Sequence, residues 1–285
     1  MFKGSAVAIV SPMNPDGSLD FDSLKNLIDF HIVNKSDAIV IVGTSGESPT
    51  LTFEEHIQLV KFTVEYVNKK IPVIAGTGAN STAEAIYLTK EAKIVGADAA
   101  LIVVPYYNKP PQEGLYQHFK MINDSVDIPQ ILYNVPSRTV VDLTDETILE
   151  LSRLKNIVGI KDATGDINRL KNIIDKVDKD FLLYSGDDLT SCEFLKLGGH
   201  GIISVTANLE PLKMHQMCMH IANQKFEEAD KIDREVQHLH KNLFVEANPI
   251  PVKWVLNKKG LIKNGIRLPL VELAKKYHSL FEGYL

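Results

Sequence analysis

Residues 38–48 read AIVIVGTSGES, a short apolar run that ends in a loop with two glycines. After a segment long enough for one crossover helix, a second run, PVIAGT, begins at residue 72. Strand, helix and strand in this order are typical of a βαβ unit, whose two strands lie parallel in one sheet. The stretch therefore predicts an α/β protein with a parallel sheet.

Eight such runs occur along the chain, at intervals of about 19 to 34 residues, the size of a strand with its crossover helix. They are nearly continuous in Val, Ile and Ala, which indicates strands covered on both faces. Eight units without a Ser/Gly-rich linker favour a closed (β/α)8 TIM barrel over an open doubly wound sheet. The runs are AVAIVSP (6–12), AIVIVG (38–43), PVIAGT (72–77), AALIVVP (99–105), PQILYNV (129–135), IVGIKDA (157–163), FLLYSGD (181–187) and HGIISVTA (200–207).

The end of the chain follows the eighth unit and is predicted to be helical. We expect the barrel over residues 1–224 and a C-terminal helical appendage over residues 225–285, since this tail is short and polar for an independent domain. Periodic apolar residues predict helices in it over residues 226–244, 249–257 and 269–281.

The composition excludes several classes of partner. Of 285 residues, 31 are Lys or Arg and 36 are Asp or Glu, giving a formal net charge of −5, without the basic surface that nucleic acid requires. The longest apolar stretch, residues 99–107, contains Pro105 and is far shorter than the roughly 20 residues that cross a bilayer. The N-terminus has no signal-peptide pattern, so we expect a cytoplasmic protein that binds neither nucleic acid nor membrane.

Metal and dinucleotide sites have little support. His215 and His220 are five residues apart and do not share a helix face, so a zinc site is not predicted. The stretch GTGANST from residue 76 begins like a dinucleotide fingerprint but lacks its third glycine. Cys192 and Cys218, the only cysteines, are expected to be buried apolar residues.

Lys161 ends the sixth run, and the active site of a barrel lies at the carboxyl ends of its strands. Burial of an ammonium in the barrel mouth lowers its pKa and leaves a neutral amine able to attack a carbonyl carbon. The alternative from this run alone is a lysine that reaches solvent or pairs with Asp162.

Two further candidates lie in YNVPSRT, residues 133–139. A phenol near Lys161 can act as an acid and then as a base during imine formation, so Tyr133 is a candidate, although a strand tyrosine is more often a packing residue. The planar fork of Arg138 suits a carboxylate, although a loop arginine is usually only solvated.

The loop GTSGES, residues 43–48, is a candidate carboxylate site. Its glycines allow close approach of the backbone, and the hydroxyls of Thr44 and Ser45 can act together with main-chain N–H groups. No G-K-[ST] follows, so it is not a phosphate loop. The alternative is a tight turn before a helix.

Five motifs in this order resemble the dihydrodipicolinate synthase family, a resemblance that extends over nearly the whole chain to RLPL at 267–270. The motifs are GTSGES (43–48), YYNKP (106–110), YNVPSRT (133–139), GIKDATGD (159–166) and NPIPVKW (248–254). The resemblance implies a pyruvate-dependent class I aldolase of lysine and diaminopimelate biosynthesis, which condenses pyruvate with L-aspartate 4-semialdehyde and needs no metal or organic cofactor.

The family also implies roles for individual residues. Lys161 is expected to form the Schiff base with pyruvate. Tyr133 is expected to donate and accept the proton, relayed through Thr44 to Tyr107, which reaches in from a neighbouring subunit of a homotetramer built as a dimer of dimers. Ser45 and the backbone at Ile203 are expected to bind pyruvate, and Arg138 the carboxylate of the aldehyde.

The sequence departs from the family in two places near these residues. Ser45 stands where the family usually has threonine, which keeps the hydroxyl and loses a methyl group. Val140 stands where the family often has glycine, so the backbone there is restricted.

A distal site for lysine as a feedback inhibitor is also implied by the resemblance. Phe53 stands where lysine-sensitive relatives often have histidine, and a proline replaces a small residue at position 49, so we expect weakened inhibition. The residues that carry this expectation are Ser48, Pro49, His56, Asn80, Glu84 and Tyr106.

Two rival functions stay open on the sequence alone. One keeps the imine chemistry with another aldehyde, as in the sialic acid and keto-deoxy sugar acid lyases of the same superfamily, and Arg138 argues against it. The other is a non-catalytic amino-acid-binding barrel, against which the intact set of Lys161, Tyr133 and Thr44 argues.

Overall fold

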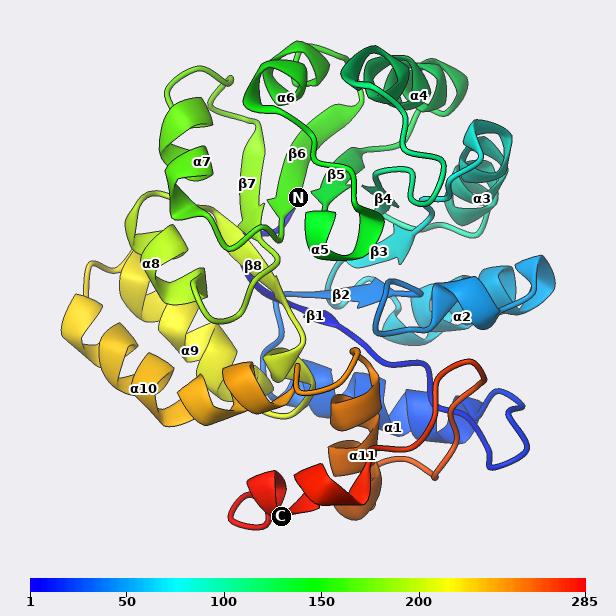
Figure 1. Cartoon of the computed structure of the whole chain (residues 1–285), viewed down its shortest axis with the longest axis vertical. Coiled ribbons are helices and arrows are strands. Elements are labelled where there is room, and N and C mark those ends of the chain that lie inside the picture. The colour runs from blue at the N-terminus through cyan, green and yellow to red at the C-terminus, as the bar shows by residue number, and fades with distance from the viewer.

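The computed structural model describes all residues, 1–285, and its central feature is a closed barrel of eight parallel strands in chain order (Figure 1). The last strand pairs with the first, so the sheet has no free edge. The predicted (β/α)8 barrel is confirmed. Its strands are β1 (Gly4–Ala8), β2 (Ala38–Ile41), β3 (Val73–Gly76), β4 (Ala99–Val103), β5 (Gln130–Asn134), β6 (Ile157–Asp162), β7 (Leu182–Ser185) and β8 (Gly201–Ser204).

Helices surround the barrel, and side chains cap several of them. Asp20, Ser81 and Thr144 each accept a backbone N–H of the first turn, and Thr52 forms a complete capping box with Glu55. The α-helices are α1 (Phe21–Val33), α2 (Phe53–Val67), α3 (Thr82–Ile94), α4 (Gln112–Ser125), α5 (Pro136–Thr139), α6 (Asp145–Leu151), α7 (Ile167–Ile173), α8 (Ser191–Lys196), α9 (Pro211–Ala222), α10 (Phe226–Asn242) and α11 (Ile250–Lys258). Three 3-10 helices complete the set, η1 (Ser48–Thr50), η2 (Thr206–Asn208) and η3 (Lys275–Phe281).

In the tail, two of the three expected helices form and the third differs. The segments predicted at 226–244 and 249–257 become α10 and α11. The segment predicted at 269–281 is not an α-helix: only η3 forms, over its second half. Pro269 has no N–H, and the N–H of Ala274 donates to the Glu246 carboxylate (3.3 Å) rather than to a helical carbonyl.

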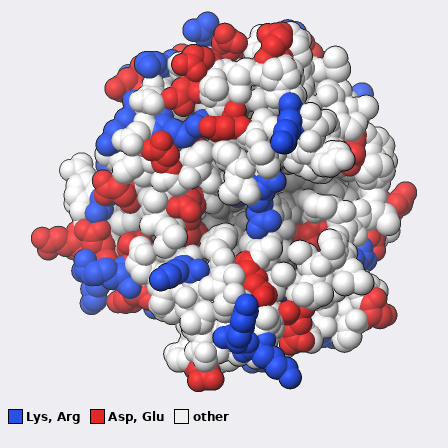
Figure 2. All heavy atoms as spheres, in the orientation of Figure 1, with Lys and Arg blue, Asp and Glu red and all other residues white.

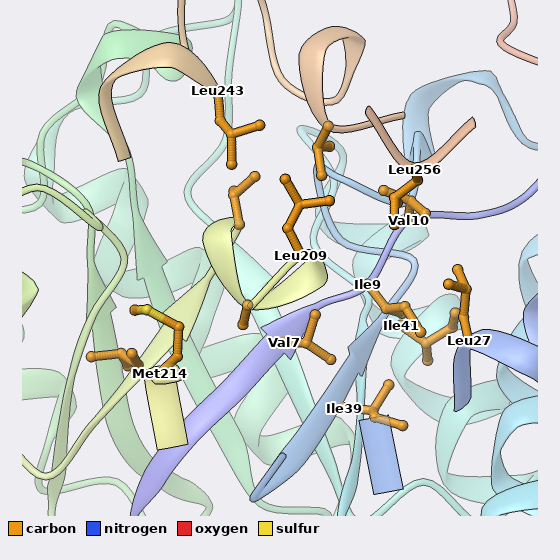
Figure 3. Packing of buried hydrophobic residues seen from close by; sticks show 14 of the residues in the cluster. Val7, Ile9, Val10, Leu27, Ile39, Ile41, Leu209, Met214, Leu243 and Leu256 are labelled. Atoms are coloured by element: carbon orange, nitrogen blue, oxygen red, sulfur yellow. The ribbon is translucent and has the colours of Figure 1, made fainter. Parts of the chain in front are cut away.

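The tail packs directly on the barrel. One apolar cluster contains barrel residues together with residues of α10, α11 and η3, among them Val236, Leu256 and Phe281. Figure 3 shows part of this cluster, which includes Leu243 and Leu256 of the tail together with Val7 of β1 and Ile41 of β2. The division of the chain after residue 224 stays a prediction.

The amino-terminal end of the barrel is filled by aromatic side chains. The ring of Phe2 stacks on Tyr184 with centroids 4.6 Å apart, and the Tyr184 hydroxyl donates to the Phe2 carbonyl (2.8 Å). The barrel therefore opens at its carboxyl end, which faces the viewer in Figure 1. None of the helices combines the length and the apolar character needed to cross a membrane.

Val140 adopts a backbone conformation that β-branched residues rarely tolerate. It ends α5 in the left-handed region, with φ 60°, and its N–H donates to the Pro136 carbonyl (2.9 Å). This conformation costs a residue with a Cβ roughly 1–2 kcal/mol of free energy, whereas glycine adopts it without that cost.

We therefore expect Val140→Gly to raise the free energy of unfolding by about 0.5 to 1 kcal/mol, after the greater freedom of glycine in the unfolded chain is subtracted. Urea titration followed by circular dichroism measures the change. Val33→Gly is the matched control, because Val33 is equally exposed (76% against 70%) but helical, so this substitution should destabilise the protein. Equal destabilisation by both substitutions would show that Val140 is unstrained.

Candidate active site

A cavity of about 540 Å³ opens at the carboxyl end of the barrel. Figure 2 shows this face hollowed near its centre, with Lys or Arg atoms beside the hollow. Its wall is contributed by loops after several strands and by the segment between α10 and α11. The residues that line it and carry chemistry are Thr44, Ser45, Tyr133, Arg138, Lys161, Asp187, Glu246 and Asn248.

Lys161 and Tyr133 lie side by side in this cavity. They are register partners on β6 and β5, and the Lys161 Nζ lies 4.2 Å from the centroid of the Tyr133 ring. Lys161 is only 6% exposed, so it does not reach solvent freely. The structure thus brings together the two residues on which the sequence argument depends most.

Asp162 is not the partner of Lys161, because successive residues of a strand point to opposite faces. Its carboxylate lies among the surrounding helices, 3.2 Å from Arg169 Nε, and accepts from the Thr164 hydroxyl (3.0 Å). Burial raises the pKa of the Asp162 carboxyl, although Arg169 acts in the opposite direction. The Lys161 amine is therefore left without an acidic partner.

Gly186 leaves the space that the Lys161 side chain occupies. A Cβ added to Gly186 would lie 2.5 Å from the Lys161 Cε, 3.0 Å from its Cγ and 2.9 Å from the Ala163 Cβ. These contacts are closer than carbon atoms allow. Any larger residue here must displace the lysine, a constraint that the sequence did not reveal.

Ser45 and Arg138 are joined through Asn248. The Asn248 side-chain amide donates to the Ser45 hydroxyl (3.0 Å), and the Arg138 guanidinium donates to the Asn248 carbonyl (3.1 Å). The Asn248 Oδ1 is buried and has no partner, which leaves an acceptor available beside the cavity. Asn248 lies in the motif NPIPVKW, but the sequence predicted no role for it, because 203 residues separate it from Ser45.

Ile203 and Tyr107 stand apart from this group within one chain. Ile203 lies in the barrel wall as the register partner of Ala6, and its side chain does not line the cavity. Tyr107 is 90% exposed, has a φ of 75°, and lines a separate surface hollow with Arg138 and Val140. The chain alone does not bring Tyr107 to Tyr133 and Thr44.

The residues expected to bind lysine lie around η1, α2 and α3. The His56 Nε2 is 2.8 Å from the Gly76 carbonyl, and burial lowers the pKa of His56 to about 4. Burial and the nearby Glu84 carboxylate raise the pKa of Tyr106, and the Asn80 carbonyl accepts from Asn108 (2.8 Å). Ser48 and Pro49 begin η1.

Phe53 packs against an aromatic neighbour at this region. Its ring is tilted against Tyr87 with centroids 5.6 Å apart, and both side chains are exposed. A histidine at this position would offer a hydrogen-bonding nitrogen that phenylalanine lacks.

The histidines and cysteines form no metal centre, and no group of three or more His, Cys, Asp or Glu side chains is placed to hold a metal ion. The His215 Nδ1 is 3.0 Å from the Asp37 carboxylate instead. Cys192 and Cys218 are both free and buried, as predicted, and burial raises the pKa of each thiol.

A buried lysine amine beside a phenol, at the open end of a (β/α)8 barrel, is an arrangement typical of enzymes whose nucleophile is an amine. The family model for the dihydrodipicolinate synthetase family matches residues 1–285. The chain belongs to this family.

Relatives of this family are similar to the chain along nearly its whole length. The 4-hydroxy-tetrahydrodipicolinate synthase of Dechloromonas aromatica is 58% identical over 96% of this chain and 94% of its own. A crystal structure of the chloride-inhibited dihydrodipicolinate synthase of Acinetobacter baumannii with pyruvate has a TM-score of 0.96 and 53% identity, covering 98% of this chain and 96% of that one. The lysine-bound enzyme of Cyanidioschyzon merolae has a TM-score of 0.96 and 38% identity, covering 99% and 96%.

The sequence predicted this family, its barrel and a lyase with the 4-hydroxy-tetrahydrodipicolinate synthase activity of lysine and diaminopimelate biosynthesis. All of these predictions are confirmed.

Gly186→Ala is expected to lower synthase activity by about 100-fold, the loss typical of a reactive group displaced by about 1 Å. The added methyl group competes with the Lys161 Cε for the same volume and also lies 2.9 Å from the Ala163 Cβ. Steady-state turnover measures the loss, and circular dichroism checks folding. Gly283→Ala is the control, because nothing lies within 4 Å of its added Cβ. Full activity of Gly186→Ala would mean that the lysine does not need this space.

Proposed function

We propose that the chain condenses pyruvate with L-aspartate 4-semialdehyde through a Schiff base on Lys161. The observation that carries this proposal is the buried Lys161 amine, unpaired by any carboxylate and 4.2 Å from the Tyr133 ring in an open cavity. The pyruvate held by the Acinetobacter baumannii relative supports the choice of first substrate.

The Lys161 amine attacks the keto carbon of pyruvate, and Tyr133 supplies the proton with which the former keto oxygen leaves as water. The resulting iminium withdraws electrons, so a methyl proton is lost and an enamine forms. The enamine carbon attacks the aldehyde carbon of the second substrate, and the aldehyde oxygen takes a proton. The amino group of that substrate then attacks the imine carbon, closes the ring and displaces the Lys161 amine.

We assign the carboxylates to the polar groups around the cavity. Thr44, Ser45 and the backbone at Ile203 hold the carboxylate of pyruvate, and the Asn248 amide supports this by orienting the Ser45 hydroxyl. Arg138 holds the carboxylate of the aldehyde at the mouth of the cavity, where its contact with the Asn248 carbonyl orients the guanidinium.

Tyr107 enters the proposal through a second copy of the chain. Its side chain is 90% exposed beside a hollow that contains Arg138. We propose a homotetramer, a dimer of dimers in the cytoplasm, in which the partner subunit's Tyr107 completes the proton relay from Tyr133 through Thr44.

The test of the proposed chemistry is reduction with borohydride in the presence of pyruvate. We expect one reduced three-carbon acid attached to Lys161, located by peptide mass spectrometry, because borohydride converts the imine into a stable secondary amine that stays on the protein. Lys161→Ala should form no adduct and lose turnover. Active protein that forms no adduct would refute the Schiff base, and a Lys161→Ala variant with unchanged function would favour a non-catalytic amino-acid-binding barrel.

The second substrate is tested by comparison. Turnover of aspartate semialdehyde should exceed turnover of sialic acid and keto-deoxy sugar acids, since Arg138 offers a cation to a small charged aldehyde. The opposite order would favour the sugar acid lyases.

We further propose that lysine inhibits the enzyme at Ser48, Pro49, His56, Asn80, Glu84 and Tyr106. The lysine bound to the Cyanidioschyzon merolae relative supports this, and the Glu84 carboxylate beside Tyr106 supplies a charge for an ammonium group.

Millimolar lysine is expected to lower the synthase rate, and Phe53→His is expected to strengthen the inhibition because histidine restores a polar nitrogen. Initial rates across a lysine series measure both. A rate that lysine leaves unchanged in both proteins would exclude this site as a regulator.

A further inference from the structure

The loop that carries Thr44 and Ser45 is anchored on its far side by a buried carboxylate. Glu47 has a left-handed backbone with φ 56°, and its side chain is fully buried outside the cavity. One carboxylate oxygen accepts from the Lys253 ammonium of α11, and the other accepts from the backbone N–H of Arg267 (3.1 Å). Three distant parts of the chain therefore meet at Glu47.

Lys253 extends this anchor to the segment that follows β1. Its side chain is 4% exposed, and its Nζ also donates to the Ser11 carbonyl (3.1 Å). The Ser11 hydroxyl in turn donates to the Gly46 carbonyl (2.8 Å), one residue before Glu47. Burial lowers the pKa of Lys253, and the Glu47 carboxylate opposes this change.

Stability alone gives little reason for such a pair. Two charges removed from water cost about as much as their attraction returns, and apolar side chains of the same volume often serve as well. An ion pair with hydrogen bonds differs from apolar packing in its geometry, because each hydrogen bond fixes the position of a donor relative to an acceptor.

The same C-terminal segment also contacts the loop from inside the cavity. Asn248 precedes Lys253 on the approach to α11, and its amide donates to the Ser45 hydroxyl (3.0 Å). The loop is thus held between Asn248 on the cavity side and Lys253 behind it. The hydrogen bond from Asn248 is the only one that the Ser45 hydroxyl makes. The direction of this hydroxyl therefore also depends on the position of the Ser45 backbone.

We propose that Glu47 and Lys253 are positioning residues whose ion pair fixes the backbone of residues 44–47, so that Thr44 and Ser45 face the carboxylate of bound pyruvate. This inference rests on the proposed function. Neither side chain touches substrate, and the pair acts only through the loop.

The test compares the unsubstituted protein with the double variant Glu47→Gln, Lys253→Met, which removes both charges, keeps the volume and leaves no unpaired ion. We expect the KM for pyruvate to rise about tenfold, the equivalent of one charged hydrogen bond. The KM for the aldehyde should stay within about twofold, because Arg138 is connected to the loop only indirectly, through Asn248 and Ser45. The pyruvate dependence of the borohydride-trapped adduct measures the first step separately.

A second variant covers failure of the double variant to fold. Glu47→Gln alone keeps an amide oxygen for the Arg267 N–H, and a smaller rise in the pyruvate KM is expected. Asp230→Asn is the control, since it removes an ion pair with Lys196 (2.5 Å) that lies between α8 and α10, away from the loop, and should leave the pyruvate KM unchanged.

The outcomes separate the two proposals. Folded variants with lower thermal stability but an unchanged pyruvate KM would overturn the positioning role and leave the pair purely structural. A pyruvate KM that rises equally in Asp230→Asn would overturn it as well. No pyruvate adduct on the unsubstituted protein would refute the proposed function and this role with it, whereas a normal adduct with unaffected variants refutes this role alone.

Discussion

The pairing of β8 with β1 is the constraint on which the rest of the structure depends. Ser5 and Ile202, and Ala6 and Ile203, are register partners across this seam. A parallel sheet closed in this way has no unpaired edge, and all eight carboxyl ends meet at one end of the barrel. Side chains that are far apart in the sequence, such as Ser45 and Lys161, therefore line one cavity.

Strand alternation then decides which charges face each other. Lys161 and Asp162 are adjacent in sequence but occupy opposite sides of β6, so the amine stays inside the barrel while the carboxylate meets Arg169 outside it. Had both pointed inward, the carboxylate would lie beside the amine as an ion-pair partner. The chemistry of the cavity thus follows from the two-residue repeat of a strand.

The sequence was informative where a signal is local. Each strand is a short apolar run, Lys161 and Tyr133 stand near run ends and Arg138 follows one, so the barrel and the principal candidates could be predicted. Partners brought together across the fold could not: Asn248 reaches Ser45, and Lys253 reaches Glu47, only after the tail packs on the barrel. The α-helix predicted over 269–281 does not form, because the Glu246 carboxylate accepts the backbone N–H of Ala274. The periodicity of apolar residues contains no information about such a contact.

The aromatic filling at the amino-terminal end of the barrel has a consequence for the order of events. With Phe2 on Tyr184, the cavity is a dead end, and every reactant and product shares one entrance. On the proposed mechanism, the molecule that bonds to Lys161 enters before the molecule that it attacks, because a molecule nearer the entrance would lie across its path. The closed floor of the barrel thus favours an ordered entry of the two molecules.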